Sequence, residues 1–100
     1  MFMEVRFRND CLDRMEFDAK EDCGFPPEIV TAFRKRMQMI RSAPDERNFY
    51  ALKSLHYEKL KGSRERQHSM RLNEQWRLII EIEGKGQEKV AVIVDIEDYH

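Results

Sequence analysis

The sequence HSMRLNEQWRLIIEIE, residues 68–83, determines the fold because polar and apolar residues alternate along it in two runs. A period of two is typical of a β-strand that buries one face. The residues that must share the buried face are Met70, Leu72, Trp76 and Leu78. They do so only if the connection has an odd number of residues, because an even number would reverse the second strand. We therefore expect an antiparallel pair joined by a three-residue turn or bulge at residues 73–75.

A third strand is expected from Val90 to Ile96, where nearly every residue is apolar, as in a strand buried on both sides. Gly84-Lys85-Gly86 supplies the glycines that a hairpin turn before this strand needs. If the strand stays extended to the end of the sequence, alternation divides its side chains between two faces. Tyr99 would lie on one face, and the other would carry Val92, Val94, Ile96, Asp98 and His100.

The same register places basic residues on the open face of the sheet, opposite the core. The residues expected there are Ser69, Arg71, Gln75 and Arg77. The net charge of the chain is only −1, yet residues 53–77 hold seven Lys and Arg residues against three Glu residues. This local excess allows a phosphate-binding patch on a nearly neutral protein. A solvated sheet face explains the charge alone equally well.

The N-terminal part of the chain predicts a strand and two helices. Alternation from Phe2 to Arg8 indicates the strand, and Asn9 or Asp10 can cap a short helix that ends at Cys23-Gly24-Phe25. Pro26-Pro27 suits the first turn of the main helix, which we expect to cross the sheet. The apolar stripe of this helix consists of Ile29, Val30, Phe33, Met37 and Ile40.

Two shorter segments follow the main helix, which is expected to stop at Ser42-Ala43-Pro44. Residues 45–52 indicate a short helix or turn, held to the core by Phe49 and Tyr50. Residues 55–62 indicate a short strand or extended segment that leads to a glycine turn. The predicted fold is therefore α+β, a small antiparallel sheet packed against N-terminal helices in the order β-α-α-β-β-β.

Length and composition predict one domain, residues 1–100, in a cytoplasmic protein. Cys11 and Cys23 do not have a recognisable metal or redox spacing. Together with the lack of a signal peptide, they indicate reduced thiols in a cytosol. No run is long enough or apolar enough to cross a membrane.

Several fragments in the second half of the chain resemble a known family when they are taken together and in order. The fragments are Leu55-His56, then LKGSR at residues 60–64, then SMRLNEQWRL at residues 69–78, and finally Asp98-Tyr99-His100. This arrangement is similar to the HigB toxins of the RelE/ParE superfamily. Two positions differ from the family pattern: relatives commonly have an aromatic residue in place of His68, and the segment between His56 and Leu60 is longer here.

The resemblance implies a bacterial type II toxin with a RelE-like fold that enters the A site of the 70S ribosome and cuts messenger RNA there. It also implies neutralisation by a HigA-like antitoxin with a helix-turn-helix domain. In that family the toxin reaches operator DNA only through the antitoxin complex. The implied enzyme is a metal-independent endoribonuclease without a cofactor.

Cutting RNA without a metal requires a base for the ribose 2′-hydroxyl, an acid for the leaving 5′-oxygen and positive charge around the phosphate. His56 and His100 are the candidates for proton transfer, because histidine titrates near neutral pH. By resemblance, Asp98 could orient or activate, and Tyr99 could donate a hydrogen bond or stack on a base. The sequence leaves open which residue is acid and which is base.

The candidates for phosphate binding are Lys61, Arg64, Arg71 and Arg77, since a guanidinium can bind two phosphate oxygens. Trp76 is expected in the core, and His68 is expected to be packed and hydrogen-bonded. The histidines and cysteines provide no zinc ligand spacing, so we predict no metal site.

Two other functions fit a chain of this kind. A ParE-like toxin of the same fold would act on DNA gyrase without RNA chemistry. A non-catalytic module would use its basic face only to bind RNA or DNA.

Overall fold

The computed structural model of the protein describes residues 3–64, 66–85 and 88–99. The first half contains strand β1 (Glu4–Phe7) and helices α1 (Asp10–Phe17), α2 (Pro27–Ser42) and α3 (Arg47–Ala51). The second half contains the short 3₁₀ helices η1 (Lys53–Leu55) and η2 (Gly62–Arg64) and strands β2 (Glu58–Lys59), β3 (Gln67–Arg71), β4 (Trp76–Glu83) and β5 (Val90–Asp98). The prediction for the first strand began at Phe2, which lies outside the described residues.

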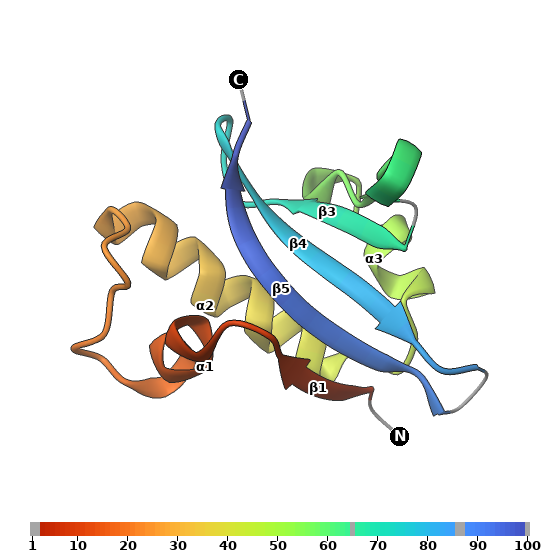
Figure 1. Ribbon diagram of the computed structural model, residues 1–100, viewed down its shortest axis with the longest axis horizontal. Coiled ribbons are helices and arrows are strands. Elements are labelled where there is room, and N and C mark those ends of the chain that lie inside the picture. The colour runs from red at the N-terminus through yellow and green to blue at the C-terminus, as the bar shows by residue number, and fades with distance from the viewer. Residues whose placement is uncertain (1–2, 65, 86–87, 100) are drawn as a thin grey trace.

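The strands form one sheet in the order β1-β5-β4-β3-β2, with α2 lying across one of its faces (Figure 1). This confirms the predicted α+β class. Strands β2 to β5 pair with their neighbours in an antiparallel manner, as expected. Strand β1 pairs with β5 in a parallel manner, so the sheet is mixed rather than wholly antiparallel. The helices and strands β2 to β4 lie between β1 and β5 in the sequence and provide the long connection that a parallel pair requires.

The register between β3 and β4 confirms the three-residue turn at residues 73–75. Met70 lies opposite Leu78, and Arg71 lies opposite Arg77. Beyond this last pair, the backbone N–H of Leu72 donates to the carbonyl of Trp76 at 2.9 Å. The side chain of Asn73 closes the turn by accepting hydrogen bonds from the backbone N–H groups of Gln75 (2.9 Å) and Trp76 (2.8 Å).

A β-bulge between β4 and β5 corrects the predicted alternation of the last strand. Ile79 lies opposite Asp95, whereas Ile80 lies opposite Ile93, so one residue of β5 is passed over between them. A bulge of this kind shifts the side chains beyond it to the other face. Val92 and Ile96 therefore lie on opposite faces, although simple alternation had assigned them to the same one.

The core lies between the sheet and α2, whose apolar stripe is buried as predicted (6% exposed or less): Ile29, Val30, Phe33, Met37 and Ile40. Trp76 is half-buried and packs against this core. Phe49 is also buried, but Tyr50 is 51% exposed, so only one of these two aromatic residues holds α3 to the core as expected. None of the helices among the described residues is long and apolar enough to span a membrane.

The two cysteines are joined by a disulfide bond, so the prediction of reduced thiols is wrong for this structure. Helix α1 ends at Phe17, earlier than expected, and the chain turns back over residues 18–25. This turn brings Cys23 beside Cys11 in the first turn of α1. A separation of 12 positions matches no standard motif, which is why the sequence pattern did not reveal the pair.

Candidate functional site

Two arginines converge at the turn end of the β3–β4 hairpin. Arg71 and Arg77 lie opposite each other in the register, and both donate to the same backbone carbonyl, that of Asn73. The distances are 3.3 Å from Arg71 Nε and 2.9 Å from Arg77 Nη1. Two guanidinium groups are thus held side by side on the sheet face that turns away from the helices. Both cations were predicted from the sequence to share this face.

His56 joins this pair from the segment before β2. Its Nε2 lies 3.1 Å from Arg71 Nη1. A guanidinium can only donate a hydrogen bond, so Nε2 is the acceptor in this arrangement. His56 itself is exposed, but its neighbours Leu55 and Tyr57 are buried, and they fix the position of the backbone between them.

The backbone of His56 has a positive φ of 46°, in the left-handed region. This conformation is uncommon for residues other than glycine and is often kept at functional positions. It ends η1, where the N–H of His56 donates to the carbonyl of Lys53 at 3.1 Å. The turn directs the chain away from η1 and leaves the imidazole at the hairpin end.

Tyr99 completes the group on the same face. Its ring lies 5.4 Å from the guanidinium carbon of Arg77, a cation–π contact. The backbone N–H of Tyr99 donates to the carbonyl of Gln75 at 2.6 Å, which ties the end of β5 to the hairpin turn. We call His56, Arg71, Arg77 and Tyr99 the hairpin-end cluster.

Arg64 borders the hairpin-end cluster, but its charge is already paired. It donates to both carboxylate oxygens of Glu97, at 2.9 and 2.7 Å. This carboxylate raises the pKa of Arg64 by accepting its hydrogen bonds. Glu97 lies opposite Arg77 in the register, and the sequence reasoning missed it. Its alternation with Tyr99 along β5 was the signal that could have placed it on this face.

The remaining predicted residues lie elsewhere or outside the described residues. Asp98 is on the opposite side of the sheet from Tyr99, opposite Trp76, and accepts a hydrogen bond from Gln75 Nε2 at 3.0 Å. Lys61 is exposed in the segment between β2 and η2. His100 lies outside the described residues. Ser69 shares a face of β3 with Arg71, as expected, but it is fully buried, and its hydroxyl has no hydrogen-bond partner among the described residues.

The ion pair between Arg71 and Glu74 at the edge of the hairpin-end cluster is exposed to solvent. Arg71 also forms an ion pair with Glu74 at 2.6 Å, but the Glu74 side chain is 94% exposed. Exposed ion pairs of this type are weak. An incoming phosphate can therefore replace Glu74 as the partner of Arg71 at little cost.

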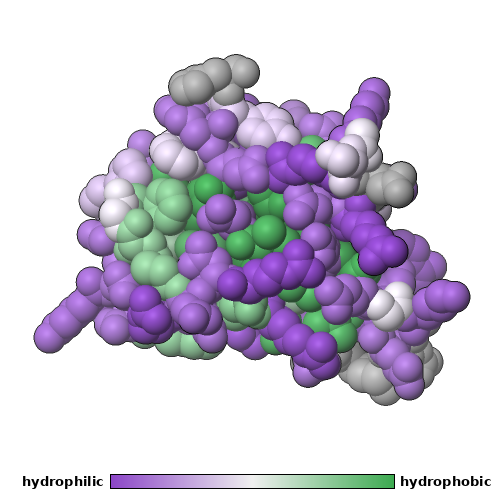
Figure 2. All heavy atoms as spheres, viewed as in Figure 1, coloured by the Kyte–Doolittle hydropathy of each residue, from purple (hydrophilic) through white to green (hydrophobic). Residues whose placement is uncertain are grey.

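Figure 2 shows hydrophobic atoms in the middle of the sheet face, framed by hydrophilic side chains.

A separate hollow of about 640 Å³ includes residues near the β4–β5 turn in its lining. Its lining mixes charges of both signs, and Arg8 and Lys89 are paired there with Glu81 and Glu46. None of the described residues of the hairpin-end cluster lines this hollow.

His68 also lines that hollow, and its ring stacks on Tyr57 with centroids 4.9 Å apart. The prediction that His68 is packed is confirmed. Its Nδ1 is buried without a hydrogen-bond partner among the described residues, so the expected hydrogen bond is not made at that atom. Burial lowers the pKa of His68.

One group of side chains among the described residues has the composition of a metal site. Cys11, Glu21 and Cys23 place one possible ligand atom each within 4.8 Å of one another. Both sulfur atoms take part in the disulfide, however, and a zinc ligand must be a thiolate. The group is therefore no metal site in the state described.

Comparison with solved structures identifies the fold. The chain is similar to the YoeB/ParE toxin from Agrobacterium tumefaciens, with a TM-score of 0.60 and 18% identity over 98% of this chain and 100% of that one. It is also similar to a chain of the YoeB–YefM complex from Staphylococcus aureus, with a TM-score of 0.54 and 16% identity over 100% and 99%. The chain thus shares its fold with these YoeB-type toxin structures. A search of curated protein sequences finds no match.

A family model gives the more specific assignment. The model described as the RelE-like toxin of the type II toxin-antitoxin system HigB matches residues 5–100. The chain belongs to this family of HigB-like toxins, as the sequence fragments predicted.

Proposed function

We propose that the chain is a ribosome-dependent endoribonuclease that cuts translated messenger RNA in the ribosomal A site. Cleavage stops translation and growth, which makes the protein a toxin. The observation that supports this most is the hairpin-end cluster, where an imidazole, two guanidinium groups and a phenol ring meet on one open face. These groups match the requirements of metal-independent RNA cleavage.

In this proposal His56 is the general base. Its Nε2 lies 3.1 Å from Arg71 Nη1, and in the reaction this nitrogen would exchange the contact with Arg71 for the proton of the ribose. The 2′-hydroxyl of the ribose loses its proton to this nitrogen and attacks the adjacent phosphorus. The bond from phosphorus to the 5′-oxygen then breaks, which leaves a 2′,3′-cyclic phosphate and a free 5′-hydroxyl after protonation by an acid. His100 remains the candidate for this acid on the basis of the sequence.

The two arginines would stabilise the phosphate while negative charge builds up on its oxygens. Arg71 can exchange the exposed Glu74 for a phosphate oxygen without losing its hydrogen bond to the Asn73 carbonyl. Arg77 is held by the same carbonyl, so both cations are positioned before RNA arrives. Tyr99 would stack on a base next to the cut. Lys61 and Arg64 would bind the RNA backbone further from the reacting phosphate.

Asp98 has an indirect role in this proposal. Its carboxylate accepts a hydrogen bond from Gln75, in the turn that also supplies the Asn73 carbonyl. It would therefore position the turn rather than contact RNA.

We propose a HigA-like protein with a helix-turn-helix domain as the antitoxin, and operator DNA would be bound only through that complex. The structure from Staphylococcus aureus, in which YoeB is bound to YefM, supports an antitoxin partner for a toxin of this fold. Because the ribosome is the target, the proposal also places the protein in the cytoplasm.

The test is cleavage in a reconstituted bacterial translation system with a defined messenger RNA. The expected result is new 5′ ends within translated codons that appear only when ribosomes are translating the message. A parallel supercoiling assay with DNA gyrase serves as the control for the alternative toxin function. Inhibition of gyrase with an intact message would reject the proposal in favour of a ParE-like activity, and binding of RNA without cuts would favour the non-catalytic module.

A further inference from the structure

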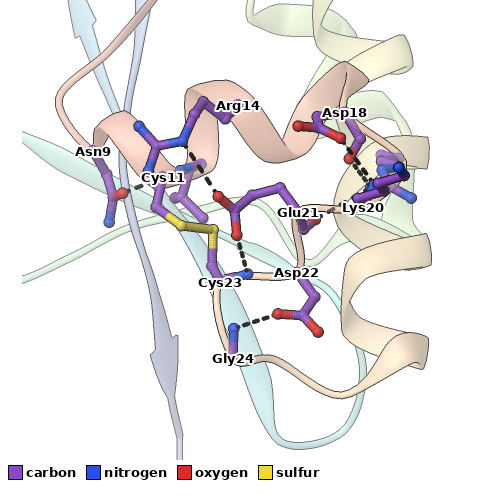
Figure 3. A network of polar contacts seen from close by, with 11 residues as sticks. Asn9, Cys11, Arg14, Asp18, Lys20, Glu21, Asp22, Cys23 and Gly24 are labelled. Carbon is purple, nitrogen blue, oxygen red and sulfur yellow. Dashed lines mark hydrogen bonds and ion pairs between the residues drawn. A yellow bond between two sulfur atoms is a disulfide. The ribbon is translucent and has the colours of Figure 1, made fainter.

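The disulfide between Cys11 and Cys23 lies in a network of polar contacts outside the hairpin-end cluster (Figure 3). Glu21 is at its centre: its carboxylate accepts hydrogen bonds from Arg14 Nε and from the backbone N–H of Cys23, both at 3.3 Å. The two sulfur atoms lie close to this carboxylate. The bond thus joins α1 to the segment that precedes α2.

The segment around Cys23 adopts an uncommon backbone conformation beside the disulfide. Cys23 has a φ of 51° and Gly24 a φ of 79°, so two consecutive residues are left-handed. Glycine tolerates this conformation, but cysteine does not favour it. The side chain of Asp22 also stabilises the turn by accepting a hydrogen bond from the N–H of Gly24 at 2.9 Å. Breaking the disulfide removes the covalent part of this arrangement.

Phe25 connects this turn to the hairpin. It lies two residues after Cys23, and its ring makes an edge contact with Trp76, with centroids 5.6 Å apart. Trp76 is the first residue of β4, and its carbonyl accepts the hydrogen bond that closes the β3–β4 turn. Arg77, in the hairpin-end cluster, is the next residue. The Phe25–Trp76 contact therefore connects the turn at Cys23 to the hairpin.

Both cysteines are only partly buried, so small thiol reagents can reach them. In the cytoplasm, where the proposed function places the protein, glutathione keeps most thiols reduced, and disulfides there are usually transient or redox-sensing. The sequence has no further cysteine that could form a competing disulfide with Cys11 or Cys23, so the pair can be oxidised and reduced without rearrangement to another partner.

We propose that Cys11 and Cys23 form a reversible thiol–disulfide site that responds to low-molecular-weight disulfides such as glutathione disulfide. The thiolate of one cysteine attacks a sulfur of glutathione disulfide, forms a mixed disulfide and releases one glutathione thiolate. The second cysteine thiolate attacks the protein sulfur of the mixed disulfide and releases the second glutathione. The protein loses two electrons and two protons, and glutathione disulfide is reduced to two glutathione molecules. Oxidation holds Phe25 against Trp76 and stabilises the hairpin.

The experiment equilibrates the purified protein in glutathione buffers of defined ratio and then blocks free thiols with N-ethylmaleimide. Three readouts are compared: the number of blocked thiols by mass spectrometry, the fluorescence of Trp76, which is the single tryptophan of the chain, and the melting temperature. The controls are a Cys11→Ser/Cys23→Ser double variant and a Phe25→Leu variant, which keeps the cysteines and loses the aromatic contact.

The expected result is a single transition in which the wild type loses both reactive thiols, changes its tryptophan fluorescence and melts about 10 °C higher or more. The double variant should show no transition. Phe25→Leu should form the disulfide with little change in fluorescence. Two wild-type thiols that stay reactive in glutathione disulfide, or oxidation without a change in fluorescence and melting temperature, would overturn the proposal. So would zinc binding by the reduced protein that blocks its oxidation, because the pair would then be a metal site with Glu21.

These three readouts need no catalytic activity, so they test the thiol–disulfide site independently of the proposed nuclease function. A further assay depends on that function: the oxidised wild type should cut messenger RNA about five-fold faster or more than the reduced protein. Equal cleavage rates for the oxidised and reduced protein would show that the disulfide does not affect the hairpin-end cluster. An inactive protein that still shows the redox transition would leave the thiol–disulfide site in place and reject the nuclease instead.

Discussion

Replacing Arg71 by alanine should reduce RNA cleavage strongly and change the stability of the fold only slightly. The guanidinium of Arg71 contacts His56, the carbonyl of Asn73 and the exposed carboxylate of Glu74. The strand itself is anchored independently, because Arg36 of α2 donates to the backbone carbonyl of residue 71 at 2.9 Å. This anchor remains in the variant.

The structure gives the expected magnitudes. The ion pair with Glu74 is solvent-exposed, so its loss should cost less than about 1 kcal/mol of the free energy of unfolding. In the reaction, Arg71→Ala removes charge-assisted hydrogen bonds to the phosphate, worth about 1.5–3 kcal/mol. This corresponds to a cleavage rate lower by a factor of roughly 10–150. Arg71→Lys keeps one charge but lacks the planar fork, and should recover only part of the loss.

The assay is single-turnover cleavage of a defined message on purified ribosomes, together with a urea unfolding curve for each variant. Arg6→Ala is the matched control, since Arg6 is an exposed arginine of β1 whose ion pair among the described residues is a local one with Glu4 at 3.3 Å. A rate for Arg71→Ala within about three-fold of Arg6→Ala would refute the reasoning, given the loss expected for a phosphate contact. So would a loss of activity fully explained by unfolding.

Three other changes test separate parts of the account. Tyr99→Phe should cleave RNA nearly as well as the wild type, because stacking on a base needs only the ring. Tyr99→Ala should bind RNA about 5- to 150-fold more weakly. Equal losses in the two variants would assign the role to the hydroxyl. Glu16→Ala should lower the free energy of unfolding in urea by about 2 kcal/mol, since it removes a buried carboxylate that Arg41 binds at 2.5 and 2.7 Å; a change under about 0.5 kcal/mol would contradict this. Burial lowers the pKa of His68 below its usual value of 6.5. Between these two pKa values the unfolded chain therefore binds more protons at His68 than the folded chain does. The free energy of unfolding should consequently fall as the pH drops below about 6.5. His68→Phe should flatten this part of the profile relative to an exposed-histidine control, His56→Ala, and an unchanged slope would contradict the assignment.

The hairpin was predictable from the sequence because a single physical rule decided it. Met70 and Leu78 had to share the buried face, and only an odd-numbered turn permits this. The same rule placed Arg71 and Arg77 together on the open face, and the structure brings them to one carbonyl. Local patterns of this kind need no knowledge of distant contacts.

The features that the sequence did not reveal depend on distant contacts or on a break in a pattern. The bulge in β5 cannot be read from an apolar run, since Val92 and Ile93 suit either face. The parallel pairing of β1 depends on how the helices return the chain to the sheet. The disulfide depends on a tight turn at Cys23 with no recognised spacing.

For the hairpin-end cluster, the sequence identified the residue types but not all of their positions. His56 reaches Arg71 because η1 ends in a left-handed turn, a conformation that no local pattern predicted. Glu97 was overlooked because its partner, Arg64, lies 33 positions away in the sequence. Asp98 and Tyr99 lie on opposite faces of the sheet, as expected for consecutive residues at the end of the strand.

The most direct test of the central claim is to map messenger RNA 5′ ends in bacteria that lack the antitoxin. The wild type, His56→Ala and Arg6→Ala are induced in parallel, with protein levels matched by immunoblot. The account predicts new ends within translated codons for the wild type and Arg6→Ala, and none for His56→Ala. Cuts that persist in His56→Ala, or growth arrest by the wild type with intact messages, would contradict it.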